Sequence, residues 1–217
     1  MPLDQKAITN AIKEAKEKSK KRNFTQSIEL IVNMQDIDMK SPQGRIQERI
    51  ELPHPSPEKP NKICVIASGE LALKARRAKA NRVIEKSGLQ GLAGKKKELR
   101  KIANEYDFFI AEAPLMPVVG KIMGPALGPR GKMPVPVPPT ADITSLTKKY
   151  RKMVFIRMRN QPVIRCRVGT ESMKDEEITE NVQAVLRVLE RKLKRGIKNI
   201  KSTNIKTSMG TPVKVSI

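Results

Sequence analysis

The pattern of hydrophobic and polar positions changes twice along this chain, and each change marks a different kind of local structure. Residues 3–22 place apolar side chains at i, i+3, i+4 and i+7, with lysines elsewhere, which predicts an amphipathic helix. Those apolar positions are Ile8, Ala11, Ile12 and Ala15. Residues 27–34 (SIELIVNM) and 45–52 (RIQERIEL) predict strands with a polar loop between them. Residues 53–60 (PHPSPEKP) hold four prolines, which is typical of a linker.

From residue 62 onward, strands and helices alternate. KICVIAS at 62–68 is a continuous apolar run, as expected of a strand buried on both faces. The segments that follow predict a helix at 70–80, a strand at 82–86, a helix at 94–106 and a strand at 107–113. MPVVGKIMGPALG at 116–128 predicts a short helix, which the Gly/Pro segment 124–139 is expected to end. This alternation indicates parallel βαβ units in a Rossmann-like sheet.

The pattern of hydrophobic and polar positions changes again at residue 153, where the alternation of strands and helices ends. MVFIRMR, a turn at NQP and VIRCRVG predict a β-hairpin over 153–169. Residues 174–195 predict a helix with one apolar face, and Gly196 stands where a C-cap is expected. PVKVSI at 212–217 reads as a closing strand, which needs sheet partners from the N-terminal strands.

These elements predict an α/β protein with two domains. Residues 1–60 and 153–217 are expected to form a discontinuous α+β domain. Residues 61–152 are expected to form a Rossmann-like α/β domain inserted into it. Two chain crossings join the domains, and such a connection permits a hinge.

The charge of the chain points to a polyanionic partner. Lys and Arg number 44 against 22 Asp and Glu in 217 residues, a formal charge of +22. A positive charge of this size is larger than solubility alone requires. Nucleic acid is therefore the first candidate partner, ahead of an anionic membrane surface. No apolar run approaches the roughly 20 residues of a membrane-spanning helix, and residues 1–21 lack the apolar core of a signal peptide. A cytoplasmic protein without membrane association is therefore expected.

Cysteine, histidine and aromatic usage argues against metal chemistry and base stacking. Cys64 and Cys166 lie in apolar strand-like runs and are expected to be reduced core residues. His54 is the only histidine and no CxxC occurs, so no zinc site, His-based catalytic arrangement or cofactor is expected. The chain has four Phe, two Tyr and no Trp. An RNA-binding chain of this kind should read backbone, 2′-hydroxyls and folded shape.

Two segments suggest phosphate binding or catalysis but have simpler interpretations. GLQGLAGKKK at 88–97 contains GxxG and ends in Gly-Lys, yet it matches neither the P-loop nor the dinucleotide fingerprint. A flexible loop before a helix is favoured for it. The acidic run 175–177 lies at a predicted helix start, where carboxylates stabilise the helix dipole.

The basic runs and one C-terminal loop are more informative. No acidic residue occurs between Asp142 and Glu171, a span that holds eight Lys and Arg. Arg165 and Arg167 are i, i+2 in a strand and share a face, which fits a phosphate-facing surface better than a merely solvated one. KTSMGTP at 206–212 offers hydroxyl donors for ribose, a glycine for close backbone approach and a methionine that can pack on a sugar or base face.

Four segments, in this order along the chain, resemble one known family. They are NFTQSIELIVNM (23–34), VVGKIMGPALGPRGKMPVP (118–136), VGTESM with ITENVQAVL (168–186) and KTSMGTP (206–212). Together they are similar to the universal exit-site stalk proteins of the large ribosomal subunit, the L-one family, in its archaeal form. The Gly/Pro block is the most specific of the four.

The resemblance implies a non-enzymatic structural constituent of the large ribosomal subunit with an inserted middle domain. It implies binding to the rRNA junction of the exit-site stalk and help in releasing deacylated tRNA. It also implies repression of the protein's own mRNA, through its leader or coding region. The protein is expected to be ribosome-bound and cytoplasmic, and a monomer when free.

The expected RNA-binding residues combine the matched motifs with the charge pattern. They are Phe24, Ser27, Glu29, Arg165, Arg167, Ser202, Thr207, Ser208, Met209, Gly210 and Thr211. In the Gly/Pro block, Lys121, Arg130 and Lys132 either face passing tRNA or belong to a stiff structural loop, and the sequence leaves both interpretations open.

Two rival classes are weighed against this prediction. A Rossmann-like middle domain could bind a nucleotide in an enzyme, but the phosphate loop is missing. A DNA-compacting chromatin protein would also be basic and poor in aromatic residues. Preference for rRNA over duplex DNA distinguishes the ribosomal prediction from the second rival.

Overall fold

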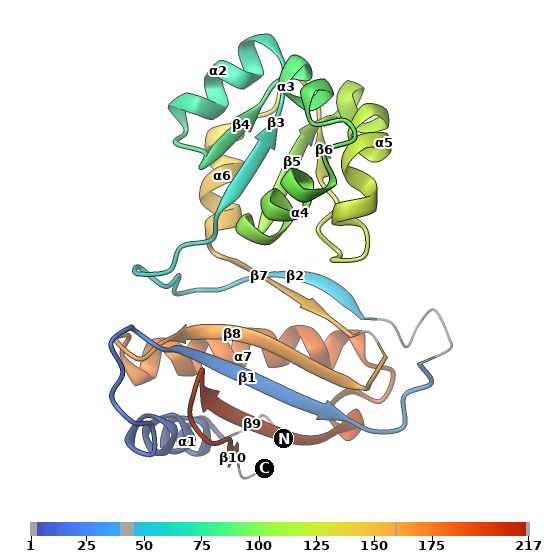
Figure 1. Ribbon diagram of the computed structural model, residues 1–217. Helices are drawn as coiled ribbons and strands as arrows, with labels where there is room; N and C mark the ends of the chain where they lie inside the picture. Colours follow the sequence, from blue (N-terminus) through green and yellow to red (C-terminus); the bar gives the residue numbers. More distant parts are fainter. Residues whose placement is uncertain (1–3, 40–45, 159, 216–217) are drawn as a thin grey trace. The chain divides into compact units, whose positions relative to one another are not determined.

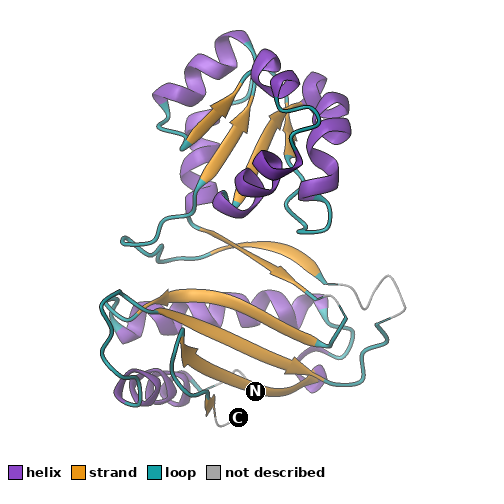
Figure 2. Cartoon of the chain, viewed as in Figure 1, coloured by secondary structure: helices purple, strands orange, loops and turns teal. Residues whose placement is uncertain are grey.

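The computed structural model describes residues 4–39, 46–158 and 160–215 (Figure 1). The chain divides into two compact units, which we call the discontinuous unit (Met1–Lys59 with Lys152–Ile217) and the inserted unit (Pro60–Arg151). Helices and strands alternate in the inserted unit, whereas the strands dominate one side of the discontinuous unit (Figure 2). The expected α/β class is confirmed.

The main sheet of the discontinuous unit has four antiparallel strands in the order β10-β9-β1-β8. Their bounds are Ser27–Met34 (β1), Val163–Thr170 (β8), Ile200–Thr207 (β9) and Val213–Val215 (β10). Along β1, fully buried residues alternate with half-buried ones, as in a sheet with one packed face. Two helices, α1 (Gln5–Glu17) and α7 (Asp175–Lys192), pack on that face (Figure 1).

Capping and helix-dipole interactions stabilise α1 and α7. The Asp4 side chain caps α1 by accepting from the Lys6 N–H, and the predicted apolar stripe of α1 is buried. Three acidic residues occupy the first turn of α7, where they complement the helix dipole. The C-cap of α7 is Leu193, not the predicted Gly196. Gly196 instead adopts φ 55° at the start of a 3-10 turn, η3 (Gly196–Asn199).

The predicted hairpin at 153–169 is wrong. β7 (Met153–Arg157) pairs with β2 (Gln47–Glu51) in a separate two-stranded sheet, and β8 pairs with β1. The Met158 N–H donates to the Ile46 carbonyl at 2.9 Å, which continues the pairing of β7 with β2. The Pro162 carbonyl accepts from the Met34 N–H at 2.8 Å, which begins the pairing of β8 with β1. The chain thus changes sheets between these two bonds; Arg159 lies outside the described residues.

The inserted unit contains a parallel sheet in the order β4-β3-β5-β6. Its strands are Ile63–Ile66 (β3), Arg82–Ile84 (β4), Phe108–Glu112 (β5) and Val135–Val137 (β6). The residues of β3 and β5 are all buried, as the apolar runs predict. β6 was not predicted, because its sequence VPV reads as a loop. Proline fits there because β6 is an edge strand.

Five helices and one short turn surround this sheet. They are α2 (Gly69–Arg77), α3 (Lys86–Gly91), α4 (Lys96–Glu105), α5 (Met116–Leu127) and α6 (Ile143–Arg151), with η2 (Ala113–Leu115) before α5. Alternate residues of β3 face opposite sides, and Cys64 and Ile66 share a core with α3, α4 and α5. α2 and α6 pack together and against β3.

Of two further expectations for the inserted unit, one needs correction and the other is confirmed. Residues 88–97 do not form a simple loop, because α3 occupies their first half. The short helix expected at 116–128 is confirmed as α5, which continues through Pro125 to Leu127 and has Gly128 as its C-cap. The Gly128 N–H then donates to the Gly124 carbonyl at 2.8 Å, which keeps the last turn closed despite the proline.

Candidate nucleic-acid interface

The outer face of the four-stranded sheet gathers polar and basic side chains from strands distant in sequence. Glu29 of β1 lies between Arg167 of β8 and Lys206 of β9 in the strand register. The next row, two residues along β1, contains Arg165, Ile31, Asn204 and Lys214, and the row after it contains Val163, Asn33 and Ser202. The sequence-predicted residues Glu29, Arg165, Arg167 and Ser202 therefore share one face.

This face is cationic and rich in hydrogen-bonding groups. Arg165 and Lys214 are exposed, and the other members of the rows are half-buried. Glu29 is the one carboxylate among the described residues of these three rows. The Asn33 amide donates to Ser202 Oγ at 2.8 Å, which fixes both side chains across two strands. A flat, positively charged sheet face of this kind can follow a phosphate backbone.

The turn between β9 and β10 is clamped to the start of β1. The Ser208 N–H donates to the Ser27 carbonyl at 2.9 Å, and the Ser27 N–H donates to Ser208 Oγ at 3.1 Å. Met209 follows, and this residue is 62% exposed. Its N–H donates to Gln26 Oε1 at 3.2 Å. The turn thus holds a large apolar side chain in solvent on a backbone fixed at several points.

Gln26 connects the segments that support this turn. It is 1% exposed, and its side-chain amide donates to Ser19 Oγ at 2.8 Å and to the Lys20 carbonyl at 3.2 Å. Its N–H donates to Glu171 Oε1 at 2.8 Å, and its carbonyl accepts from the Glu171 N–H at 3.0 Å. Sequence reasoning missed Gln26. The available signal was a polar residue inside the matched motif at 23–34.

Thr207 does not have the predicted role. Its side chain is fully buried, and its hydroxyl donates to Ser19 Oγ at 2.9 Å, so it cannot offer that hydroxyl to a ribose. Thr207 lies on the inward side of β9 because it alternates with Lys206 and Ser208. A Cβ atom added at Gly210 would overlap Thr207 Oγ1, so any other residue there would force the Thr207 hydroxyl to move. Thr211 is exposed.

Phe24 is presented beside the clamped turn. Half of its surface is exposed, and the Lys59 ammonium lies 5.7 Å from its ring centroid, a cation–π arrangement. Lys59 also donates to the Thr25 carbonyl and, at 3.4 Å, to Ser27 Oγ. Lys59 therefore ties the end of the proline-rich linker to the residues at the start of β1.

A basic pocket adjoins Phe24, and sequence reasoning missed it. Its lining consists of Lys16, Ser19, Lys20, Lys21, Arg22, Asn23, Phe24, Thr25 and Glu171. The prediction placed residues 18–22 in the first helix, but α1 ends at Glu17 and the basic run lies in the connection to β1. Lys16 is paired with Asp175 at 2.7 Å. The pocket extends the cationic character of the sheet face toward Phe24.

The basic residues of the Gly/Pro block mostly have structural roles. The Lys132 ammonium donates to the Ala103 and Tyr106 carbonyls at 3.0 and 2.7 Å, and burial lowers the pKa of Lys132 below its ordinary value. Arg130 donates to the Ala126 carbonyl and to Asn104 Oδ1, both at 2.9 Å. These bonds contradict the tRNA-facing interpretation for Lys132 and favour the structural loop. Lys121 is exposed on α5.

At the carboxyl ends of β3 and β5, where Rossmann-like sheets bind ligands, the chain places its own carboxylate, Glu112. The strand order reverses between β3 and β5, and ligands bind such folds beyond the carboxyl ends of those strands. There, Glu112 accepts from the Ser68 N–H at 2.8 Å and from the Ser68 hydroxyl at 2.7 Å. Glu112 is buried, and its side chain holds the Ser68 donors at the start of α2 that an anionic ligand would need.

Metal ligands, reactive thiols and membrane-spanning helices were also sought among the residues that the structure describes. No group of three or more His, Cys, Asp or Glu side chains there could hold a metal ion. Cys64 and Cys166 are both free and buried, as predicted, and burial raises the pKa of each thiol to about 12. Among the described residues, no helix combines the length and the apolar character needed to cross a membrane.

Comparison with known proteins agrees with the resemblance seen in the sequence. Residues 13–211 match the model of the ribosomal protein L1p/L10e family. The chain is 50% identical to the large ribosomal subunit protein uL1 of Hyperthermus butylicus, over 99% of this chain and 98% of that protein. It is 49% identical to uL1 of Pyrococcus abyssi, with the same coverage, and 48% identical to uL1 of Methanothermobacter thermautotrophicus, over 97% of this chain and 99% of that protein. The predicted family is confirmed, and with it the expectation of a non-enzymatic protein: this chain belongs to the ribosomal protein L1p/L10e family.

Proposed function

We propose that this protein is a component of the large ribosomal subunit and binds the folded rRNA junction of the exit-site stalk through its discontinuous unit. The observation that carries this proposal is the double hydrogen bond between Ser208 and Ser27, which holds Met209 exposed at the edge of the cationic sheet face. A surface ordered before binding loses little conformational entropy when RNA docks.

Recognition would rest on shape rather than on base sequence. Backbone groups of the turn, together with hydroxyl and amide groups of the outer face, can contact ribose and phosphate in a shallow minor groove. Met209 and Phe24 offer apolar surface for packing against a sugar or an unstacked base. Arg165, Arg167 and Lys206 would add a salt-dependent contribution, because each phosphate they neutralise releases counterions.

The decisive experiment measures binding of the full chain to a stalk-junction rRNA fragment, a scrambled RNA of equal length and duplex DNA, at two salt concentrations. A preference for the junction that persists at the higher salt supports shape recognition. Equal binding to all three that collapses with salt would leave only a polycation and would contradict the proposal.

A matched pair of variants tests the residues. Met209→Ala should weaken junction binding by about ten-fold, with little change in salt slope, because an apolar contact is lost. Leu73→Ala is the control, since Leu73 of α2 is also a large exposed hydrophobic residue and lies in the inserted unit. Arg165→Gln should instead lower the salt slope by about 0.7 to 0.9. Equal losses for Met209→Ala and Leu73→Ala would refute the assignment.

Two finer roles follow from the same surface. Repression of the protein's own mRNA requires only that the leader or coding region present a fold like the junction, so the mRNA should compete with the junction fragment for one site.

If the protein helps to release deacylated tRNA, ribosomes that carry the variant protein should retain exit-site tRNA longer. Kinetics of tRNA release on reconstituted ribosomes would test this second role. The free protein is proposed to be a cytoplasmic monomer before it joins the ribosome.

A further inference from the structure

One face of α4 in the inserted unit is a basic stripe. Lys97, Arg100, Lys101 and Asn104 are spaced i, i+3, i+4 and i+7, and all four are exposed. The opposite face buries Leu99, Ile102 and Ala103 in the core. α4 therefore has a fixed orientation, and its basic side chains are held toward solvent.

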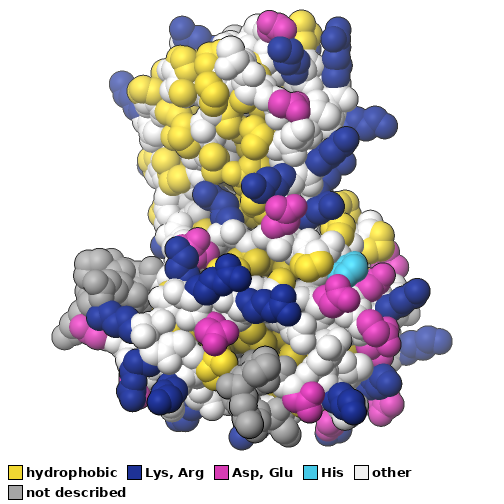
Figure 3. All heavy atoms as spheres, turned by 180° about the vertical axis from the view of Figure 1, so that it is seen from behind, with side chains coloured by type: hydrophobic (Ala, Val, Ile, Leu, Met, Phe, Trp, Pro, Cys, Tyr) yellow, Lys and Arg dark blue, Asp and Glu magenta, His cyan; other side chains and the backbone are white. Residues whose placement is uncertain are grey.

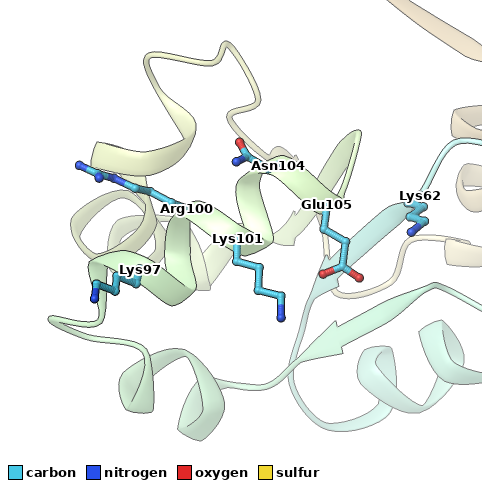
Figure 4. A pocket seen from close by; sticks show the side chains of 6 residues that line it. All are labelled: Lys62, Lys97, Arg100, Lys101, Asn104 and Glu105. Atoms are coloured by element: carbon cyan, nitrogen blue, oxygen red, sulfur yellow. The ribbon is translucent and has the colours of Figure 1, made fainter.

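The stripe forms one wall of a pocket (Figure 4). Lys62, which precedes β3, and Glu105, at the end of α4, complete the lining with the four residues of the stripe. Figure 4 shows Lys101 and Glu105 extending from the same side of α4, with Lys62 entering from a separate segment. The Lys62 N–H donates to Asp107 Oδ2 at 2.9 Å, and its carbonyl accepts from the Asp107 N–H at 2.8 Å. Lys62 is thus anchored by its backbone rather than carried on a loose loop.

The positive charge of this pocket is not neutralised within the described part of the chain. No ion pair there joins Lys62, Lys97, Arg100 or Lys101 to a carboxylate within 4.0 Å. On α2 of the same unit, by contrast, Lys74 pairs with Glu70 at 2.8 Å and Arg76 with Glu85 at 2.6 Å. Like charges one turn apart on a helix repel each other, so an anion in the pocket would relieve a cost that the fold carries.

We infer that this pocket is a second RNA-binding site, on the inserted unit, and that it takes phosphate groups of an RNA backbone. Four cationic side chains around a hollow fit successive phosphates. No aromatic side chain lines the pocket, so bases have no surface to stack on and binding is independent of sequence. RNA fits better than a membrane surface, because none of the exposed large hydrophobic residues of the described chain belongs to the lining.

Glu105 sets the strength of this site. It is the one acidic residue in the lining, and a phosphate bound near Lys62 and Lys101 would be repelled by its carboxylate. Replacing that carboxylate with an amide should therefore strengthen RNA binding. A purely structural role for the surface predicts no such gain.

The experiment uses the full chain with the stalk-junction rRNA fragment already bound, titrated with deacylated tRNA or with a short single-stranded RNA of mixed sequence. Lys97→Gln/Lys101→Gln should weaken binding of the second RNA by about five- to ten-fold at low salt and lower the salt slope by about 1.4. Lys148→Gln/Lys149→Gln is the matched control, because it removes two exposed lysines from the end of α6 in the same unit. Glu105→Gln should strengthen binding, and Glu98→Gln, on the same helix, should change it less.

Equal effects of the two double variants would overturn the inference, because they would indicate a diffuse polycation. Binding of anionic vesicles in preference to RNA, with the same dependence on Lys97 and Lys101, would also overturn it in favour of a lipid surface. Where the junction complex fails to form, the proposed function fails, and the same comparison of variants on the free chain still decides the second site. Thermal unfolding of each variant verifies that these exposed substitutions leave the fold intact.

Discussion

The two units of this protein carry the same net charge but display it on different kinds of surface. The discontinuous unit has 26 Lys and Arg against 15 Asp and Glu, and the inserted unit has 18 against 7, which is a formal +11 in each. In the first, basic residues stand on an open antiparallel sheet face beside hydroxyl and amide groups. In the second, helices cover the parallel sheet, so the charge lies on helix surfaces.

On our proposal, this difference means that net charge indicates a class of partner but not the manner of recognition. An open sheet face adds ordered backbone and short polar side chains, which can read RNA shape. A helix surface offers long, separate cationic side chains, which neutralise phosphates with little regard for shape. In the reverse view, Lys and Arg side chains are spread over both units, although hydrophobic side chains gather on part of the inserted one (Figure 3).

The largest effect should come from removing the hydrogen-bonding centre of the discontinuous unit. Gln26→Ala removes a buried side chain that hydrogen-bonds Ser19, Lys20 and Met209 and leaves a cavity in its place, and we expect a loss of about 2–4 kcal/mol in unfolding free energy. Each unit contains one buried cysteine, so thiol labelling reports the opening of each separately. Cys166 should label faster while Cys64 stays protected. Faster labelling of both would indicate that the two units unfold together.

A corresponding substitution in the inserted unit should lower the unfolding free energy somewhat less. Glu112→Ala removes the acceptor of two Ser68 hydrogen bonds, and the loss should be about 1–3 kcal/mol. Labelling should now favour Cys64 over Cys166, the reverse of the Gln26→Ala result. Junction RNA binding should be unchanged at a temperature where both variants are folded. A loss of junction binding would show that the two surfaces are coupled.

A third substitution tests the clamped turn with little change in global stability. In Gly210→Ala, the added methyl must displace the Thr207 hydroxyl from Ser19, and we expect about ten-fold weaker junction binding with about 1 kcal/mol of destabilisation. Gly91→Ala is the control, because a Cβ atom there meets nothing within 4 Å. Isothermal titration with the junction fragment, paired with urea unfolding, separates the two effects. Unchanged binding in Gly210→Ala would mean that the turn does not contact RNA.

The smallest expected effect concerns pH. Burial lowers the pKa of Lys132, so in the window between its folded pKa and the ordinary 10.5 the unfolded chain binds more protons than the folded one. Stability from this group therefore rises with pH across that window. The advantage of the wild type over Lys132→Met, measured by urea unfolding, should grow as pH rises toward 10.5. A constant difference would show that Lys132 is not desolvated in its loop.

Local patterns predicted much of the fold, and long-range pairings account for most of what was missed. The amphipathic stripe of α1 and the apolar runs of β3 and β5 are properties of neighbouring residues, so periodicity revealed them. β9 was missed because Thr203 and Thr207 are polar although both are buried. The partner of β7 was misjudged because β2 lies about a hundred residues earlier in the chain.

The site was predicted less completely, for a related reason. The motifs at 23–34 and 206–212 meet in the fold through the Ser27–Ser208 hydrogen bonds, but strand alternation places Thr207 inside and Gln26 at the centre of the support. The basic character of α4 was visible as the run at 95–101. The pocket was not, because it also requires Lys62, which the fold of the inserted unit brings next to the end of α4.

The interruption of one unit by the other has a consequence for the order of events during synthesis. β1 emerges from the ribosome early, yet its partners β8 and β9 begin at residues 163 and 200, after the whole inserted unit. The inserted unit can fold from a continuous stretch, whereas the sheet face and the clamped turn must wait. A nascent chain that stops before residue 200 lacks Ser208 and Met209. On our proposal, RNA binding at the sheet face therefore selects against prematurely terminated chains.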